Sequence, residues 1–88
     1  MTADMDIREI FALNLRKLRQ AKGMSQEKLA HLANIDRTYV SSLERCVYSP
    51  TIDMVATLAR ILEVEPRDLI TLDQSSGASG TPKPSLEK

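Results

Sequence analysis

The stretch 25-SQEKLAHLANIDRTYVSSLER-45 decides the fold of this 88-residue chain. Ser25 stands where a helix N-cap belongs, and a helix over about 26–33 follows it. Asn34 tolerates the left-handed conformation of a tight turn, and Asp36 caps a second helix over roughly 37–45. The sequence therefore predicts two helices joined by a turn too short for them to lie antiparallel side by side.

Each of these two helices has a narrow apolar face. In the first helix it consists of Leu29, Ala30 and Ala33. In the second helix the apolar stripe is formed by Val40 and Leu43. The same helical spacing predicts that five side chains of the second helix face solvent, namely Arg37, Thr38, Ser41, Ser42 and Arg45.

Helical periodicity continues on both sides of this stretch. Upstream, apolar residues recur at helical spacing and Gly23 follows as a C-terminal cap, the residues being Ile7, Phe11, Leu15 and Leu18. Downstream, Thr51 caps a fourth helix with a predicted buried face of Ile52, Val55, Leu58, Ala59 and Leu62. Pro66 opens a fifth helix, whose Leu69 and Ile70 are expected to close the core. No segment alternates with the period of a strand, so the predicted fold class is all-α.

The end of the chain differs in composition from the rest. From Gln74 onward the sequence is rich in Ser, Gly and Pro and has no apolar periodicity, so ordering it would cost entropy without burying apolar surface. Eighty-eight residues are too few for two ordinary domains. We therefore expect one compact five-helix domain over residues 1–73 and a disordered tail over 74–88.

The net charge of zero hides an uneven distribution. The chain has 12 basic and 12 acidic residues, but residues 7–46 hold eight basic against four acidic side chains, a balance of 8 − 4 = +4. Residues 47–73 hold two basic against five acidic side chains, a balance of 2 − 5 = −3. The half of the chain that contains the two short helices is thus basic and suited to an anionic partner.

Other classes of function lack their sequence signals. Cys46 is the single cysteine and His31 the single histidine, so neither a disulfide nor a metal cluster is predicted. We see no catalytic constellation, no phosphate-binding glycine loop and no small-molecule or cofactor motif. No apolar run is long enough to span a membrane and no secretory signal is present. We therefore expect a cytoplasmic protein that is not an enzyme.

The second of the two short helices has the chemistry to read DNA. An α-helix fits the major groove, and arginine bonded to guanine O6 and N7 is the commonest specific contact. Arg37 and Thr38 stand at the start of the helix, where side chains reach base edges. Taken alone, however, an exposed polar helix face is more often only solvated.

A family resemblance favours DNA binding over a helix face that is only solvated. The runs that carry it are Gly23 to Ala30, Ile35 to Arg45, Ser49 to Ile52, and Leu58 to Val64. They resemble the Cro/C1-type (XRE) helix-turn-helix family, over about Ile7 to Leu72, and the run Asp36 to Ser41 is similar to restriction-modification controller proteins. The resemblance implies a lambda-repressor-like domain that binds a symmetric double-stranded DNA operator as a homodimer and regulates transcription.

The resemblance also implies roles for individual residues. The base-reading positions of the family fall on Arg37, Thr38 and Ser42, with Ser41 close by. The phosphate-contacting positions fall on Ser25, Gln26 and Arg45, and Tyr39 is expected to touch the sugar-phosphate backbone. Arg19 and Glu44 match a structural ion pair that joins the first and third helices.

The chain departs from the family pattern at three places. Cys46 follows the recognition helix where the family usually has glycine, so it should either strain a left-handed turn by about 1 kcal/mol or force another turn. Val47, Tyr48 and Ser49 replace a loop that is often basic. Glu63 stands where a helix-terminating glycine is common.

Dimerisation is expected on energetic grounds as well. One short recognition helix reads only a few base pairs, whereas two half-sites one helical turn apart multiply the discrimination. Apolar side chains of the acidic half are the expected dimer contacts, namely Ile61, Ile70 and Leu72. The alternative is an antitoxin-like or regulator-binding module with weak DNA binding, which would carry a broad apolar patch on the third helix.

Overall fold

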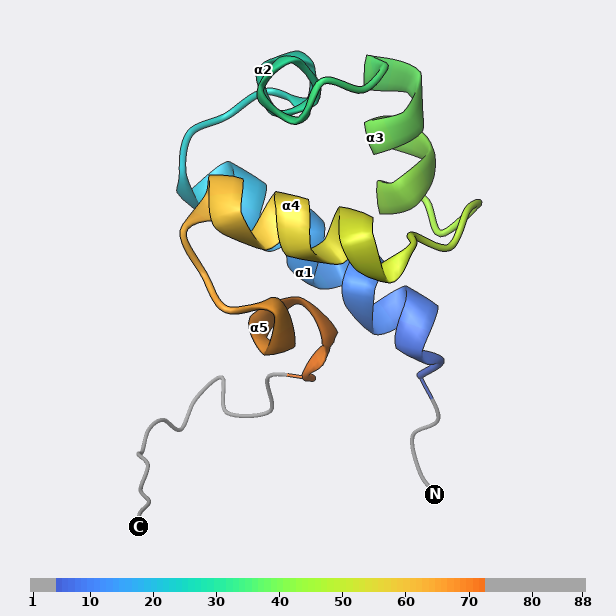
Figure 1. Cartoon of the computed structure of the whole chain (residues 1–88). Helices are drawn as coiled ribbons and strands as arrows, with labels where there is room; N and C mark the ends of the chain where they lie inside the picture. Colours follow the sequence, from blue (N-terminus) through green and yellow to red (C-terminus); the bar gives the residue numbers. More distant parts are fainter. Residues whose placement is uncertain (1–4, 73–88) are drawn as a thin grey trace, which may run out of the picture.

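The computed structural model describes residues 5–72, and within that range the chain forms five α-helices and no strand (Figure 1). The helices are α1 (Ile7–Ala21), α2 (Gln26–Ala33), α3 (Arg37–Glu44), α4 (Ile52–Leu62) and α5 (Pro66–Ile70). The all-α prediction is confirmed. The predicted tail over 74–88 lies outside the described residues.

Side-chain caps set where the helices begin. The side-chain oxygens of Ser25, Asp36 and Thr51 each accept a hydrogen bond from a first-turn backbone N–H, at 2.9 to 3.0 Å, as the sequence predicts. A fourth cap was not predicted from the sequence: Asp6 and Glu9 form a reciprocal capping box at the start of α1. The pKa of Asp6 lies below its ordinary value, mainly because Arg8 donates hydrogen bonds to its carboxylate.

Four helices end in the same backbone motif. After each of α1 to α4 one residue adopts a positive φ between 61° and 71°, and these residues are Gly23, Asn34, Cys46 and Glu63. In each case its N–H bonds to the carbonyl three residues earlier, and the next N–H bonds to the carbonyl five residues earlier, at 2.9 to 3.2 Å. This is the Schellman motif, which satisfies the last helical carbonyls. Cys46 therefore takes the left-handed turn rather than avoiding it.

The five helices enclose one apolar core. Helix α2 packs on α3 and α4, α3 packs on α1, and α5 packs on both α1 and α4. Figure 1 shows α2 and α3 on one side of α1 and α4, with α5 on the other side. The largest fully buried side chains are aliphatic apart from one ring: Phe11, Leu15, Leu29, Val40, Leu43, Leu58, Leu62 and Leu69.

A buried amide attaches α5 to α1. Asn14 lies among the buried residues, and its side chain donates to the carbonyls of Leu69 and Thr71 at 3.1 and 3.0 Å. The two bonds satisfy backbone acceptors at the end of a short helix that has few turns of its own to hold it. Together with the buried Leu69, these bonds hold α5, and Ile70 upon it, against α1.

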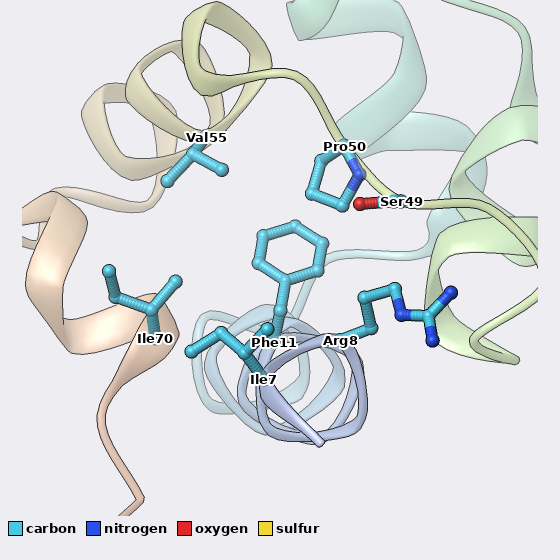
Figure 2. A pocket seen from close by; sticks show the side chains of 7 residues that line it. All are labelled: Ile7, Arg8, Phe11, Ser49, Pro50, Val55 and Ile70. Carbon is cyan, nitrogen blue, oxygen red and sulfur yellow. The ribbon is translucent and has the colours of Figure 1, made fainter.

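The apolar face predicted for α4 is partly wrong. Ile52 is 87% exposed, because it occupies the first position of α4 and lies beyond the helices that cover the rest of that face. Leu58 and Leu62 are buried as predicted. Two predictions on other helices are also wrong: Ile7 of α1 and Ile70 of α5 are exposed, and of the pair expected to close the core only Leu69 is buried. Apolar side chains of α1, α4 and α5 thus remain on one surface of the molecule, with Phe11 beneath them (Figure 2).

The left-handed turn at Cys46 leads to a stability prediction. Replacing Cys46 by glycine removes the steric clash of Cβ in the left-handed conformation, but glycine loses more backbone entropy on folding. The net effect should be a rise of about 0.5–1 kcal/mol in the free energy of unfolding. Urea unfolding at fixed protein concentration measures the change. Gly23→Ala is the matched control and should be destabilising, although open space surrounds that site, because φ there is +71°. A Cys46→Gly protein no more stable than the parent would contradict the prediction.

Candidate nucleic-acid interface

The turn between α2 and α3 determines how α3 begins. Asn34 adopts the left-handed conformation, and Ile35 then packs against the core. Asp36 accepts hydrogen bonds from both the backbone N–H and the hydroxyl of Thr38, at 3.0 and 2.8 Å. These bonds, with a smaller contribution from the charge of Arg37, hold the pKa of Asp36 below its ordinary value. The first turn of α3 is thereby fixed in place.

The predicted DNA-reading side chains occupy one side of α3. Arg37 and Thr38 are exposed at its first turn, and Arg45 is exposed at its end. Ser41 is half-buried between them, and Tyr39, which is also half-buried, lies on a different side of the helix. The start of α3 therefore presents a guanidinium and a hydroxyl to solvent next to each other.

The predicted exposure of Ser42 is wrong. Ser42 is only 8% exposed, and its backbone carbonyl accepts a hydrogen bond from the N–H of Val47 at 2.9 Å. Because α3 packs against both α2 and α1, its buried arc is wider than the stripe of Val40 and Leu43 and includes Ser42 and Glu44. We therefore leave Ser42 out of the base-reading set.

The predicted ion pair between α1 and α3 forms behind this surface. The Nε of Arg19 donates to Glu44 Oε2 at 2.6 Å and its Nη2 donates to Oε1 at 3.1 Å. A third bond runs from Arg19 Nη1 to the carbonyl of Met24 at 2.7 Å, which brings in the turn before α2. The Glu44 side chain is 1% exposed and that of Arg19 is 11% exposed. The hydrogen bonds to Glu44 raise the pKa of Arg19 above its ordinary value.

Two further residues join Glu44 that sequence reasoning had not linked to it. Gln26, at the start of α2, donates its side-chain amide to Glu44 Oε1 at 3.1 Å. The exposed Arg16 places its Nε 4.0 Å from the same oxygen. Arg16 and Arg19 are three residues apart on α1 and thus share a face, which is the signal that could have found this contact. Gln26 is therefore both a predicted phosphate contact and part of a buried network.

Of the other phosphate-contacting candidates, Ser25 and Arg45 lie at the surface and Tyr39 is half-buried. Ser25 is exposed, and its hydroxyl oxygen already accepts the N–H of Lys28 as the cap of α2. The first-turn amides of a helix carry partial positive charge and bind anions. Within residues 5–72 no group of three potential metal-ligating side chains occurs, and no helix there is long and apolar enough to cross a membrane.

Two helices joined by a short turn, the second of them exposed only on the side that carries Arg37 and Thr38, define a helix-turn-helix motif. The family model HTH_3, described as helix-turn-helix, matches residues 15–69. The chain belongs to this family, which is the XRE or Cro/C1 type, and is a transcriptional regulator of the controller-protein kind.

Individual relatives agree with this placement. The chain is 39% identical to control protein C.SmaI of Serratia marcescens over 67 residues, 76% of this chain and 80% of that protein. The crystal structure of the restriction-modification controller protein C.AhdI from Aeromonas hydrophila superposes with a TM-score of 0.68 and 44% identity, over 70% of this chain and 94% of that one.

A third relative was solved with DNA. The restriction-modification controller protein C.Esp1396I was crystallised as a tetramer in complex with its natural 35-base-pair operator. That structure has a TM-score of 0.67 and 33% identity, over 75% of this chain and 87% of that one.

The buried network gives a prediction about stability. Glu44→Gln keeps the shape of the side chain but leaves the charge of Arg19 without its counter-ion. We expect a loss of about 3 kcal/mol in the free energy of unfolding, near the lower end for a broken buried pair, because Arg19 keeps the Met24 carbonyl. Urea unfolding at pH 7 measures it.

The control for this prediction is an ion pair at the surface. Lys22 and Glu63 pair across the ends of α1 and α4, and the Glu63 side chain is largely exposed. Lys22→Ala should therefore cost less than about 1 kcal/mol. Equal losses from Glu44→Gln and Lys22→Ala would show that burial does not distinguish the two pairs.

Proposed function

We propose that this regulator binds a two-fold symmetric DNA operator as a homodimer, with α3 of each subunit in the major groove. The observation that carries the proposal is the exposure of Arg37 and Thr38 together at the start of α3, on a turn held by Asp36. The operator complex of C.Esp1396I supports a DNA partner. We expect it to act in the cytoplasm as a regulator, without catalysis or a cofactor.

The hydrogen bonds of the free protein favour particular base contacts. Arg37 can donate two parallel bonds to guanine O6 and N7. The hydroxyl of Thr38 donates its hydrogen to Asp36, so toward DNA this side chain offers the lone pairs of its oxygen and its methyl group. Those features match an adenine or cytosine amino group or a thymine methyl. Ser41, one turn further along α3, has a hydroxyl that both donates and accepts.

Contacts with phosphates would come from three sides of this surface. Ser25 and the amides at the start of α2 offer donors, and Arg45 adds a charge at the end of α3. Gln26 has two amide hydrogens, and one is bound to Glu44. Its second hydrogen is thus held in a defined direction for a phosphate. Tyr39 offers a hydroxyl between the base-reading residues and the following loop.

Replacing Arg37 by alanine tests the assignment of α3. With a duplex that the wild-type protein selects from a random-sequence pool, binding should weaken by about 1–3 kcal/mol, while binding to a scrambled duplex changes less. Fluorescence anisotropy of a labelled duplex measures both.

Arg60→Ala is the matched control for Arg37→Ala. It removes an equal charge from an exposed site on α4, in the half of that helix far from α3 (Figure 1). It should leave the preference for the selected duplex intact. If both variants lose the same affinity for both duplexes, α3 is not the reading helix.

The apolar surface on α1, α4 and α5 is the proposed dimer face. Ile7, Val55 and Ile70 line a pocket there, with Phe11 at its base (Figure 2). Ile52, exposed one turn before Val55 on α4, extends this face. Of the three dimer contacts expected from the sequence, only Ile70 is exposed, since Ile61 and Leu72 are half-buried. A second copy would cover side chains that a monomer leaves in water.

Ile52→Lys tests the dimer face. A charge in the middle of an apolar interface is left desolvated, so the variant should sediment as a monomer at concentrations where the wild-type protein is a dimer. Its affinity for the selected duplex should fall with it, because the two half-sites are no longer bound together. Leu32→Lys changes an exposed leucine of α2 and should leave the dimer intact. A dimeric Ile52→Lys protein would refute this face.

The position of the apolar face also separates the two functional alternatives. A protein-docking module of this fold would expose apolar side chains on α3, but the exposed part of α3 carries Arg37 and Thr38. The exposed isoleucines lie on other helices. DNA on α3 and a second subunit on α1, α4 and α5 therefore account for both surfaces.

A further inference from the structure

The loop between α3 and α4 carries an aromatic side chain that the assigned contacts do not use. In Figure 1 this loop projects outward from the end of α3 before the chain enters α4. Tyr48, in this loop, is 56% exposed. Its ring centroid lies 6.1 Å from that of Tyr39, with an angle of 42° between the ring planes. The ring of Tyr48 thus lies next to that of Tyr39, a residue of α3 that belongs to the proposed DNA surface.

Comparison with the other helix ends shows that this loop is unusual. After each left-handed residue of the four Schellman motifs stands an apolar residue, which usually packs back on the helix. Met24, Ile35 and Val64 do so and lie against the core. Val47 is instead exposed, next to Tyr48. The loop therefore places an apolar and an aromatic side chain in solvent beside the end of α3.

The chemistry of this loop suits DNA without adding charge. Residues 46–50 read Cys-Val-Tyr-Ser-Pro and contain no basic side chain. A tyrosine hydroxyl donates hydrogen bonds to phosphate oxygens, and such contacts fix the register of a protein on the duplex. An offset, tilted ring pair holds both rings more firmly than either is held alone.

We propose that Tyr48 is a second tyrosine contact to DNA: its hydroxyl donates to a backbone phosphate, and its ring braces Tyr39. The proposal rests on the proposed function, because it requires α3 to lie in the major groove. The contact is neutral, so it adds affinity on every sequence and leaves the salt dependence of binding unchanged, unlike Arg45.

Binding measurements separate the two parts of this role. With the duplex selected by the wild-type protein, Tyr48→Phe should weaken binding about threefold to tenfold, the effect of one neutral hydrogen bond. Tyr48→Ala should weaken it further, because the brace on Tyr39 is lost as well. Both losses should recur on a scrambled duplex, with the slope of log K against log salt unchanged. Arg45→Ala should flatten that slope by about 0.9.

Tyrosine fluorescence gives a direct reading of the contact. The chain has two tyrosines and no tryptophan, so Tyr39→Phe leaves Tyr48 as the single emitting residue. Adding the selected duplex should change the emission of this variant in parallel with the anisotropy of the labelled duplex. Free N-acetyltyrosinamide titrated with the same duplex corrects for absorption by DNA.

The outcomes are distinguishable. If Tyr39→Phe binds the duplex with constant emission, or Tyr48→Ala binds like the wild-type protein, Tyr48 makes no DNA contact and the proposed function stands. If Tyr48→Ala sediments as a monomer, the side chain belongs to the dimer face and the inference is overturned. If the wild-type protein selects no duplex at all, the proposed function and this inference fall together.

Discussion

The carboxylate of Glu44 is the point on which the arrangement of α1, α2 and α3 depends. It is almost completely removed from water, and a buried charge of this kind must be compensated by close partners. Arg19 supplies two hydrogen bonds from α1 and Gln26 supplies one from α2. A rotation of α3 that exposed Arg37 differently would break these bonds. The network therefore specifies orientation, whatever its net contribution to stability.

Orientation matters here because the helices that present the proposed DNA surface are short. Helices α2 and α3 have eight residues each, too few to be stable alone in water. Their caps fix the backbone at each start, and the left-handed turns fix each end. The buried network then sets the angle between them. The side chains proposed to meet base edges are thus carried on helices whose starts, ends and relative angle are all fixed.

Most of this frame can be predicted from the sequence because caps and turns are local. Ser25, Asp36 and Thr51 cap their helices through hydrogen bonds within three residues, which composition and spacing reveal. The burial of Ser42 and the exposure of Ile52 cannot be predicted in this way, because burial depends on which other helix covers a face. Periodicity describes one helix at a time, and α3 is covered by two neighbours. The bond from Gln26 to Glu44 spans 18 residues and has no local signal.

The charge distribution gives the same surface a further property. Residues 7–46 contain eight basic side chains, but Glu44 holds Arg19 in the interior, and Lys22 is paired with Glu63. Fewer cations are therefore available to phosphates than the sequence count suggests. In the proposed complex, neutral donors would supply a larger share of the backbone contacts, namely the amides at the start of α2, the amide of Gln26 and the tyrosine hydroxyls. Since neutral contacts release no counterions, binding by such a surface depends less on salt than its basic residues alone would imply.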